Sequence, residues 1–286
     1  MKAEKITVIG GGTMGSGIAQ VFAVNGRQVT LVEAREQLAE LALNRIDKNL
    51  KRMESREKIT SEVRKRAFGK ISCLLSAEEG VKGADLVIEA VPENFEIKKS
   101  IFEMADAHAP DKAILASNTS SISITRLAAV TSRPEQVIGM HFFNPVPVMK
   151  LVEVIRGVRT STEVSDGIIS LAEEIGKVPV IAEDSPGFVS NRILMPMINE
   201  AIFCVGEGVA TPEAVDNVMK MGMAHPMGPL RLADFIGLDV CLDILNVLYE
   251  GFKDPKYRPA PFLVKMVDAG KLGDKTGEGF FKYQKE

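Results

Sequence analysis

The sequence has no tryptophan and only three cysteines, three histidines and three tyrosines among its 286 residues. Because Cys73, Cys204 and Cys241 are odd in number and far apart, we expect neither a disulfide framework nor a bound metal. No apolar run is long enough to span a membrane. With 35 basic against 38 acidic residues, the formal net charge is -3, which argues against nucleic acid as a partner.

The length of 286 residues exceeds the usual size of one domain, so two domains are expected. The hydrophobic fraction of 45% and charged fraction of 26% are those of an ordinary globular protein. The first apolar run begins at Ile6, which leaves no room for a signal or transit peptide. We therefore expect a cytoplasmic location.

The N-terminal segment has the pattern of a dinucleotide-binding turn. The apolar run ITVI at 6–9 leads directly into GGGTMG at 10–15, and a segment of small and apolar residues then ends at Asn25 and Gly26, as a helix would. In such a turn the first glycine permits the tight bend, the second lets the backbone approach a pyrophosphate, and the third allows close packing of helix on strand. The cofactor-binding residues expected here are Gly10, Gly12, Thr13, Met14 and Gly15.

A second apolar run at 29–32 ends in Glu33, about 20 residues after the glycine turn, where an acidic side chain accepts hydrogen bonds from the adenosine ribose. A carboxylate there favours NAD, because it repels the 2′-phosphate of NADP. Arg35 leaves NADP open, as it is either a phosphate contact or a solvated residue of the next helix.

Further apolar runs at 86–91, 113–116 and 137–140 predict strands that are covered on both faces, in an α/β domain with a mostly parallel sheet of Rossmann type. Ligands of such sheets bind beyond the carboxyl ends of the strands. The residues expected along this edge are therefore 92–94, 117–121 and 141–144.

His141 follows the strand at 137–140 and precedes Glu153 by twelve residues. Histidine can take and return a proton near neutral pH, and a carboxylate bonded to one ring nitrogen fixes the tautomer and stabilises the imidazolium. Alternation in the run at 150–155 places Glu153 on the face opposite Val152 and Val154. The pair is a candidate general acid/base, although Glu153 as an exposed edge-strand charge stays open.

Ser120 and Asn191 could each donate a hydrogen bond to a substrate oxygen that becomes negative. Taken singly, a serine in a turn and an asparagine on a helix are more often structural.

The polar stretch at 37–70 is too long for one crossover helix and predicts a helical pair or arm. Residues 47–70 contain nine basic and four acidic residues, a local charge of +5. Lys48, Arg52 and Arg56 are spaced by four and share one helix face. They could bind a phosphorylated ligand or form a solvated face, and charge alone does not decide between these.

Beyond the apolar run at 178–181 no further strand pattern appears. Ser185 can cap a helix with Pro186 in its first turn, and apolar residues then recur at helical spacing. We expect a Rossmann domain over 1–184 that contains the helical arm, and an all-α domain over 185–286.

These motifs, with PMGP at 226–229 and KTGEGF at 275–280, resemble the short-chain L-3-hydroxyacyl-CoA dehydrogenases over the whole chain, most closely the bacterial enzymes acting on 3-hydroxybutyryl-CoA. The resemblance implies an oxidoreductase that interconverts (S)-3-hydroxybutyryl-CoA and acetoacetyl-CoA with NAD. It also implies a homodimer formed through the helical domain. A separate enoyl-CoA hydratase or thiolase would act in the same pathway.

The resemblance assigns a role to each matching residue. His141 is the general base, Glu153 orients it, and Ser120 and Asn191 hold substrate and nicotinamide. NAD contacts are implied for Glu33, Glu93, Lys98, Ser120, Asn144 and Lys275. The basic arm is implied to bind CoA through Lys48, Asn49, Arg52 and Arg56, together with Ser120. Three positions depart from the family pattern: it has serine at Asn49, lysine at Arg56 and commonly aspartate at Glu33.

Two other functions fit the same fold. Relatives with this architecture oxidise sugar acids such as L-gulonate, and some have become non-catalytic structural proteins of the eye lens. The basic arm favours CoA over the first alternative, and the set of Ser120, His141, Glu153 and Asn191 argues against the second.

Overall fold

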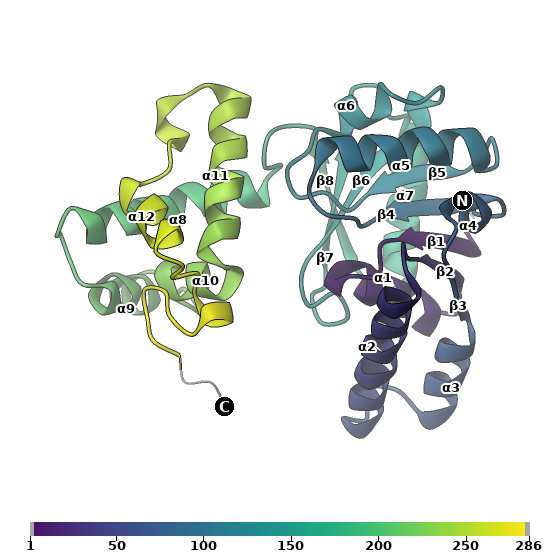
Figure 1. Ribbon diagram of the computed structural model, residues 1–286, viewed down its shortest axis with the longest axis horizontal. Helices are drawn as coiled ribbons and strands as arrows, with labels where there is room; N and C mark the ends of the chain where they lie inside the picture. Colours follow the sequence, from purple (N-terminus) through teal and green to yellow (C-terminus); the bar gives the residue numbers. More distant parts are fainter. Residues whose placement is uncertain (1–2, 284–286) are drawn as a thin grey trace. The chain divides into compact units, whose positions relative to one another are not determined.

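The chain divides into two compact units, Met1–Ser185 and Pro186–Glu286 (Figure 1). The structure is a computed structural model and describes residues 3–283. Among the helices of this range, none is long and apolar enough to cross a membrane.

The first unit contains an eight-stranded sheet in the order β3-β2-β1-β4-β5-β6-β7-β8. Neighbouring strands are parallel except β6 and β7, which are antiparallel. The mostly parallel sheet expected from the apolar runs is thereby confirmed. The strands are β1 (Lys5–Ile9), β2 (Gln28–Val32), β3 (Ile71–Leu74), β4 (Leu86–Glu89), β5 (Ile114–Ser117), β6 (Val137–Phe142), β7 (Leu151–Arg156) and β8 (Val178–Glu183).

Side chains alternate between the two faces of this sheet. One set, which includes Ile138, Met140, Val152 and Val154, packs in a continuous core with residues of α1 (Thr13–Val24), α2 (Glu36–Ser55) and α7 (Thr162–Glu174). The opposite face lies against α4 (Ala77–Val81), α5 (Phe95–His108) and α6 (Ile124–Ala128). His141 and Glu153 belong to this second face by alternation, as do the strand-end residues of β4 and β5.

The helical insert expected after the second strand consists of α2 and α3 (Ser61–Gly69). The long helix α2 buries Ala42, Ile46 and Leu50, which recur every four residues on one side. Thr60 caps α3 by accepting a hydrogen bond from the Val63 amide at 3.2 Å. The insert therefore has a buried side and a charged, exposed side.

The second unit is mainly helical, with isolated β-bridges between Gly273 and Glu278 and between Glu278 and Lys282. Its elements are α8 (Ser190–Gly206), α9 (Pro212–Gly222), α10 (Pro229–Ile236), α11 (Leu238–Phe252) and α12 (Pro261–Asp268), with short 3₁₀ turns at η2 (Pro255–Tyr257) and η3 (Asp274–Thr276). A core of fully buried side chains joins α8, α10, α11 and α12.

The helix predicted to begin at Pro186, with Ser185 as its cap, begins four residues later, at Ser190. Gly187 and Phe188 have φ angles of +72° and +49°, which no right-handed helix accommodates. Ser185 and Pro186 therefore belong to a turn that precedes the helix rather than to its first turn.

Candidate active site

His141 and Glu153 are directly paired residues of the antiparallel strands β6 and β7. His141 Nδ1 lies 2.7 Å from Glu153 Oε2, and both side chains are buried. The predicted strand at 137–140 extends two residues further, to Phe142, which carries His141 into the ladder opposite Glu153. The two residues thus meet because of register, not because of their spacing in the chain alone.

This contact determines which ring nitrogen is available for proton transfer. An ionised carboxylate can only accept hydrogen bonds, so His141 Nδ1 carries the hydrogen in the Glu153 contact. Nε2 of the neutral ring is then the basic nitrogen. Nε2 lies 3.1 Å from Ser120 Oγ. A proton acceptor and a hydroxyl donor therefore face each other at the carboxyl ends of β5 and β6.

Ser120 lies in a turn that follows β5, and Glu93 holds that turn in place. Glu93 Oε1 accepts hydrogen bonds from both hydroxyl and amide groups of the turn. The donors are Thr119 Oγ1 at 2.5 Å, Ser120 N at 3.0 Å, Ser121 N at 3.0 Å and Ser121 Oγ at 2.9 Å. Asn118 adds a link to the next strand, since its Oδ1 accepts from the Phe142 amide at 2.9 Å.

Glu93 keeps its charge in this environment. Burial alone would raise the pKa of Glu93, but Lys98 and the hydrogen bonds from Thr119 and Ser121 outweigh it, and the pKa lies below its usual range. The other oxygen, Oε2, lies 3.2 Å from Lys98 Nζ. Glu93 is therefore an ionised acceptor at neutral pH.

Lys98, which the family resemblance makes an NAD contact, is 1% exposed. Its Nζ donates to Glu89 Oε1 at 2.7 Å and to the Val91 carbonyl at 3.2 Å, in addition to its contact with Glu93. Sequence reasoning missed Glu89 altogether. The available signal was a single acidic residue inside the apolar run at 86–91.

The glycine turn has the geometry that a dinucleotide phosphate needs. Gly10 has a φ of +98°, and a Cβ on Gly15 would lie 1.7 Å from the Gly10 carbonyl oxygen, so no larger residue fits there. A Cβ on Gly12 would meet no atom of the other described residues within 4 Å, its chain neighbours aside. The backbone at the N-terminus of α1 is thus open on the side where an anion binds.

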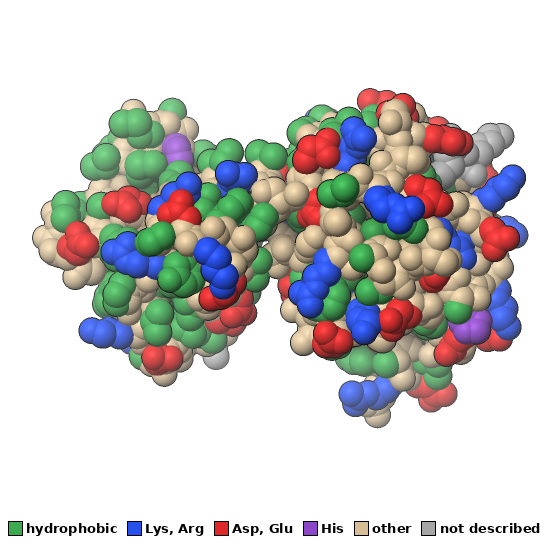
Figure 2. Space-filling model, turned by 90° about the horizontal axis from the view of Figure 1, so that it is seen from above, with side chains coloured by type: hydrophobic (Ala, Val, Ile, Leu, Met, Phe, Trp, Pro, Cys, Tyr) green, Lys and Arg blue, Asp and Glu red, His purple; other side chains and the backbone are tan. Residues whose placement is uncertain are grey.

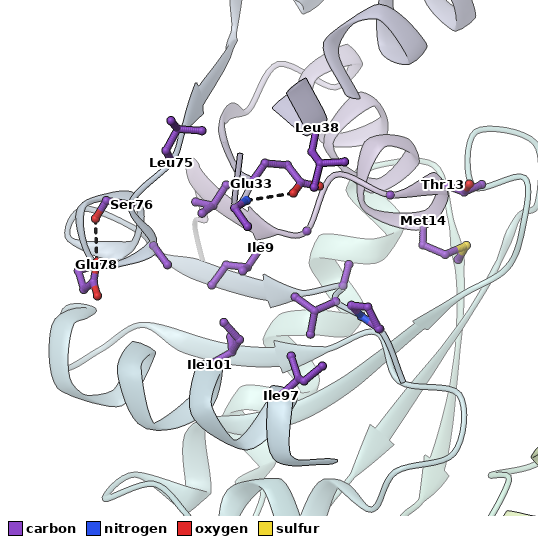
Figure 3. Close-up of a pocket in the computed structure, with 18 residues that line it drawn as sticks. Ile9, Thr13, Met14, Glu33, Leu38, Leu75, Ser76, Glu78, Ile97 and Ile101 are labelled. Carbon is purple, nitrogen blue, oxygen red and sulfur yellow. Dashed lines mark hydrogen bonds between the residues drawn. The ribbon is translucent and has the colours of Figure 1, made fainter. Parts of the chain in front are cut away.

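A cavity of about 810 Å³ opens beside this turn, at the carboxyl ends of β1, β2 and β4 (Figure 3). Glu33 lies in its wall, where Oε1 accepts from the Gly11 amide at 2.6 Å and Oε2 from the Ala34 amide at 3.1 Å. Thr13 and Met14 also line it, with mostly apolar neighbours. Among its described lining residues there is no lysine or arginine, so Arg35 does not contribute to the wall.

The exposed side of the insert carries the basic residues expected to bind phosphate. Two acidic residues of α2 are already neutralised: Asp47 lies 2.6 Å from Lys51 Nζ, and Glu54 lies 2.6 Å from Arg64 Nε. Lys48, Arg52 and Arg56 are exposed. Within residues 3–283 these three form no salt bridge, so their charge is available to a ligand. Asn49 lies beside them on α2 and is partly buried.

The other expected site residues lie in separate parts of the chain. Asn144 is exposed in the loop between β6 and β7, and its peptide bond to Pro145 is cis. Asn191 lies in the first turn of α8 and is 8% exposed. Lys275 lies in η3, where its Nζ is 2.6 Å from Asp239 Oδ2. The last two belong to the second unit, and their roles stay predictions.

Within residues 3–283, no group of three or more histidine, cysteine or acidic residues is arranged to hold a metal ion.

Two family models match the chain. The NAD binding domain of 3-hydroxyacyl-CoA dehydrogenase matches residues 5–185, and the C-terminal domain of 3-hydroxyacyl-CoA dehydrogenase matches residues 187–283.

Similar proteins match over nearly their full length. A probable 3-hydroxybutyryl-CoA dehydrogenase of Bacillus subtilis is 54% identical over 286 residues, which cover 100% of this chain and 99% of the relative. The 3-hydroxybutyryl-CoA dehydrogenase of Clostridioides difficile is 50% identical and covers 98% of this chain and 100% of its own. The solved structure of (S)-3-hydroxybutyryl-CoA dehydrogenase from Ralstonia eutropha superposes with a TM-score of 0.96 at 48% identity, covering 99% of this chain and 100% of that one.

Proposed function

Because the chain belongs to the 3-hydroxyacyl-CoA dehydrogenase family, we propose that it interconverts (S)-3-hydroxybutyryl-CoA and acetoacetyl-CoA, with His141 as general acid and base. The chain is an oxidoreductase with an NAD-binding domain. The observation that carries the catalytic proposal is the hydrogen bond of 2.7 Å between His141 Nδ1 and Glu153 Oε2, which leaves Nε2 as the basic nitrogen.

In the oxidation, His141 Nε2 takes the proton of the 3-hydroxyl group. The ring becomes positively charged, and Glu153 stabilises that charge through Nδ1. In the reduction, the imidazolium returns the proton from Nε2 to the alcohol oxygen. The buried position of both residues keeps water from competing for their hydrogen bonds, which strengthens the contact.

Ser120 is proposed to bind the substrate oxygen through its hydroxyl group. Ser120 Oγ lies 3.1 Å from His141 Nε2, so an oxygen near both groups would meet a donor and a proton acceptor together. Asn191 is proposed as a second donor from the helical domain. Neither residue needs to change its charge during turnover.

NAD fits the residues of the first unit. The open glycine turn is proposed to bind the pyrophosphate, and Glu33, which follows β2 and lines the cavity, is proposed to accept from a ribose. Bound at this turn, the cofactor would supply the hydride chemistry at the 3-carbon of the substrate, as acceptor in the oxidation and as donor in the reduction. Glu93 and Asn144 are proposed to contact the cofactor, and Lys98 and Lys275 to assist its binding.

The exposed basic side of α2 is proposed to bind the phosphates of CoA. Lys48, Arg52 and Arg56 have no acidic partner within the described residues, and guanidinium groups pair with phosphate through two hydrogen bonds. A free sugar acid has no phosphates to use this surface. The basic side of α2 therefore favours the CoA ester over the sugar-acid alternative.

We also propose a cytoplasmic homodimer formed through the helical unit. Large apolar side chains on α8, α9 and α10 are exposed, and Figure 2 shows many such side chains over this unit. They include Ile193 (67% exposed), Val218 (60%), Met221 (79%) and Phe235 (54%). Exposed apolar surface of this extent marks a protein interface. Light scattering should give the mass of two chains, whereas a monomer would contradict the proposal.

The substrate class is tested by initial rates of NADH oxidation with acetoacetyl-CoA and with free acetoacetate. We expect rapid turnover with the CoA ester only. Equal rates with the two substrates would remove CoA from the proposal, and no turnover with either would contradict the proposed reaction.

A further inference from the structure

We propose that the buried pair of Glu89 and Lys98 is a positioning device that acts through Glu93 on Ser120, and so sets the contact of Ser120 with His141. Neither residue of the pair reaches the reacting atoms. The expected effect on turnover rests on the proposed function, whereas the positioning itself rests only on contacts within the first unit.

Glu89 is the fixed end of this network. It is the last residue of β4 and lies opposite Ser117 in the register of β4 with β5. Its Oε2 accepts from Ser117 Oγ at 2.6 Å, and its Oε1 accepts from the Val91 amide at 2.7 Å. Since Glu89 is 1% exposed, protein contacts rather than solvent determine the position of both of its carboxylate oxygens.

Lys98 connects Glu89 to Glu93. Its ammonium group has three hydrogens and three acceptors: Glu89 Oε1 at 2.7 Å, Val91 O at 3.2 Å and Glu93 Oε2 at 3.2 Å. Glu93 then uses its other oxygen for the turn at 119–121. The two carboxylate oxygens of Glu93 thus have different partners: Oε2 contacts Lys98, and Oε1 accepts hydrogen bonds from the turn.

The turn transmits this position to the catalytic pair. Glu93 Oε1 bonds the backbone amides of Ser120 and Ser121, both at 3.0 Å, so the backbone on either side of the Ser120 side chain is fixed. Ser120 Oγ then lies 3.1 Å from His141 Nε2. A continuous series of contacts therefore leads from Glu89 to the nitrogen that moves the proton.

Stability alone does not explain a charged pair at this depth. Removing two charges from water costs several kcal/mol per ion, and well-packed apolar residues of similar volume often serve stability equally well. A hydrogen-bonded pair fixes the orientation of the groups that it joins, whereas apolar packing does not. Burial raises the pKa of Glu89 despite Lys98 and Ser117, consistent with a position where charge is costly.

The test changes both members together, because removal of one would leave the other charge buried and unpaired. In the variant Glu89→Gln with Lys98→Met, ¹⁵N-labelled histidine reports on His141 in protein without cofactor, and the chain has only three histidines to resolve. We expect the His141 Nε2 resonance to move in the same direction as in Ser120→Ala. An unchanged resonance would overturn the proposal, whether or not the wild type turns over acetoacetyl-CoA.

Kinetics provide the second readout. We expect the paired variant to lower kcat about tenfold with little change in the KM for acetoacetyl-CoA. In a Ser120→Ala background the same two substitutions should lower kcat by less than about a further twofold, because the effects of residues in one network are not additive. If the kcat losses of the paired variant and of Ser120→Ala multiply in the combined variant, the pair does not act through Ser120. A wild type without turnover would refute the proposed function instead.

The matched control is the pair Asp106 and Arg133, whose Oδ1 and Nε atoms lie 2.8 Å apart at the other end of α5. Asp106→Asn with Arg133→Met should leave the His141 resonance and kcat unchanged. If the Glu89 and Lys98 variant does not fold, Glu93→Gln replaces it, since that side chain is 38% exposed and its ion pair with Lys98 is lost in the same way. An unchanged His141 resonance in Glu93→Gln would likewise overturn the proposal.

Discussion

Glu153 faces His141 across the antiparallel strands β6 and β7, with Oε2 2.7 Å from Nδ1. Both residues lie on regular strands, so their separation is set by backbone hydrogen bonds on each side. If the pair acts as proposed, a contact held in this way costs little conformational entropy at the moment of reaction.

Glu153→Gln should lower kcat about tenfold or more, because the charged form of His141 loses the carboxylate that stabilises it. The acidic limb of the rate profile should move to lower pH for the same reason. The matched control is Glu183→Gln at the exposed end of β8, which should leave both unchanged. An unaltered profile in Glu153→Gln would remove its orienting role.

Glu33→Gln should narrow the preference for NADH over NADPH, since the amide no longer repels a 2′-phosphate. The wild type should favour NADH by about tenfold or more in kcat/KM, as none of the described residues that line the cavity beside Glu33 is basic. Rates with both cofactors, together with their dissociation constants from fluorescence titration, measure the change. A wild type that prefers NADPH would contradict the account of this cavity.

Neutralising Lys48, Arg52 and Arg56 to glutamine should raise the KM for acetoacetyl-CoA about tenfold and leave kcat near the wild-type value, because the contacts are equal in ground and transition states. The salt dependence of KM should also decrease. The control variant changes Lys5, Lys82 and Lys112 to glutamine, which removes the same charge from exposed residues outside the insert. If the control raises KM as much as the triple variant, the basic side of α2 is not a specific site.

Asp106 should contribute to stability in a pH-dependent way. Burial would raise its pKa, but the hydrogen bonds from Ser132 and Arg133 outweigh it and lower the pKa below 3.8. The stabilisation is therefore complete above that value and is lost as the pH falls through the lower native pKa. Asp106→Asn should reduce the free energy of unfolding in urea by about 2 kcal/mol at pH 7. A difference that does not shrink below pH 4, about the unfolded pKa, would contradict this.

Much of the fold follows from local sequence patterns. The strand, glycine turn and helix at the N-terminus are predictable because three glycines and an apolar strand leave few alternatives. The strand β3 was missed, since its four residues alternate between exposed and half-buried and carry no long apolar run. The start of α8 was misplaced because Phe188 adopts a positive φ that no propensity indicates.

The candidate site was likewise predictable only in part. The spacing of His141 and Glu153 suggests a pair, but their contact depends on an antiparallel register that spacing does not encode. Glu89 shows the limit most clearly, because its partners Lys98 and Ser117 come from a helix and another strand. Such long-range pairing of buried charges has no local periodicity by which to recognise it.

The proton-transfer role of His141 is tested by the turnover of His141→Ala with acetoacetyl-CoA, measured beside the NADH dissociation constant. We expect a kcat at least about a hundredfold below wild type with NADH binding nearly unchanged, because only the proton transfer is lost. His108→Ala, at the exposed end of α5, serves as control and should keep full activity. A His141→Ala protein that retains most of its turnover would contradict the central claim that His141 moves the proton.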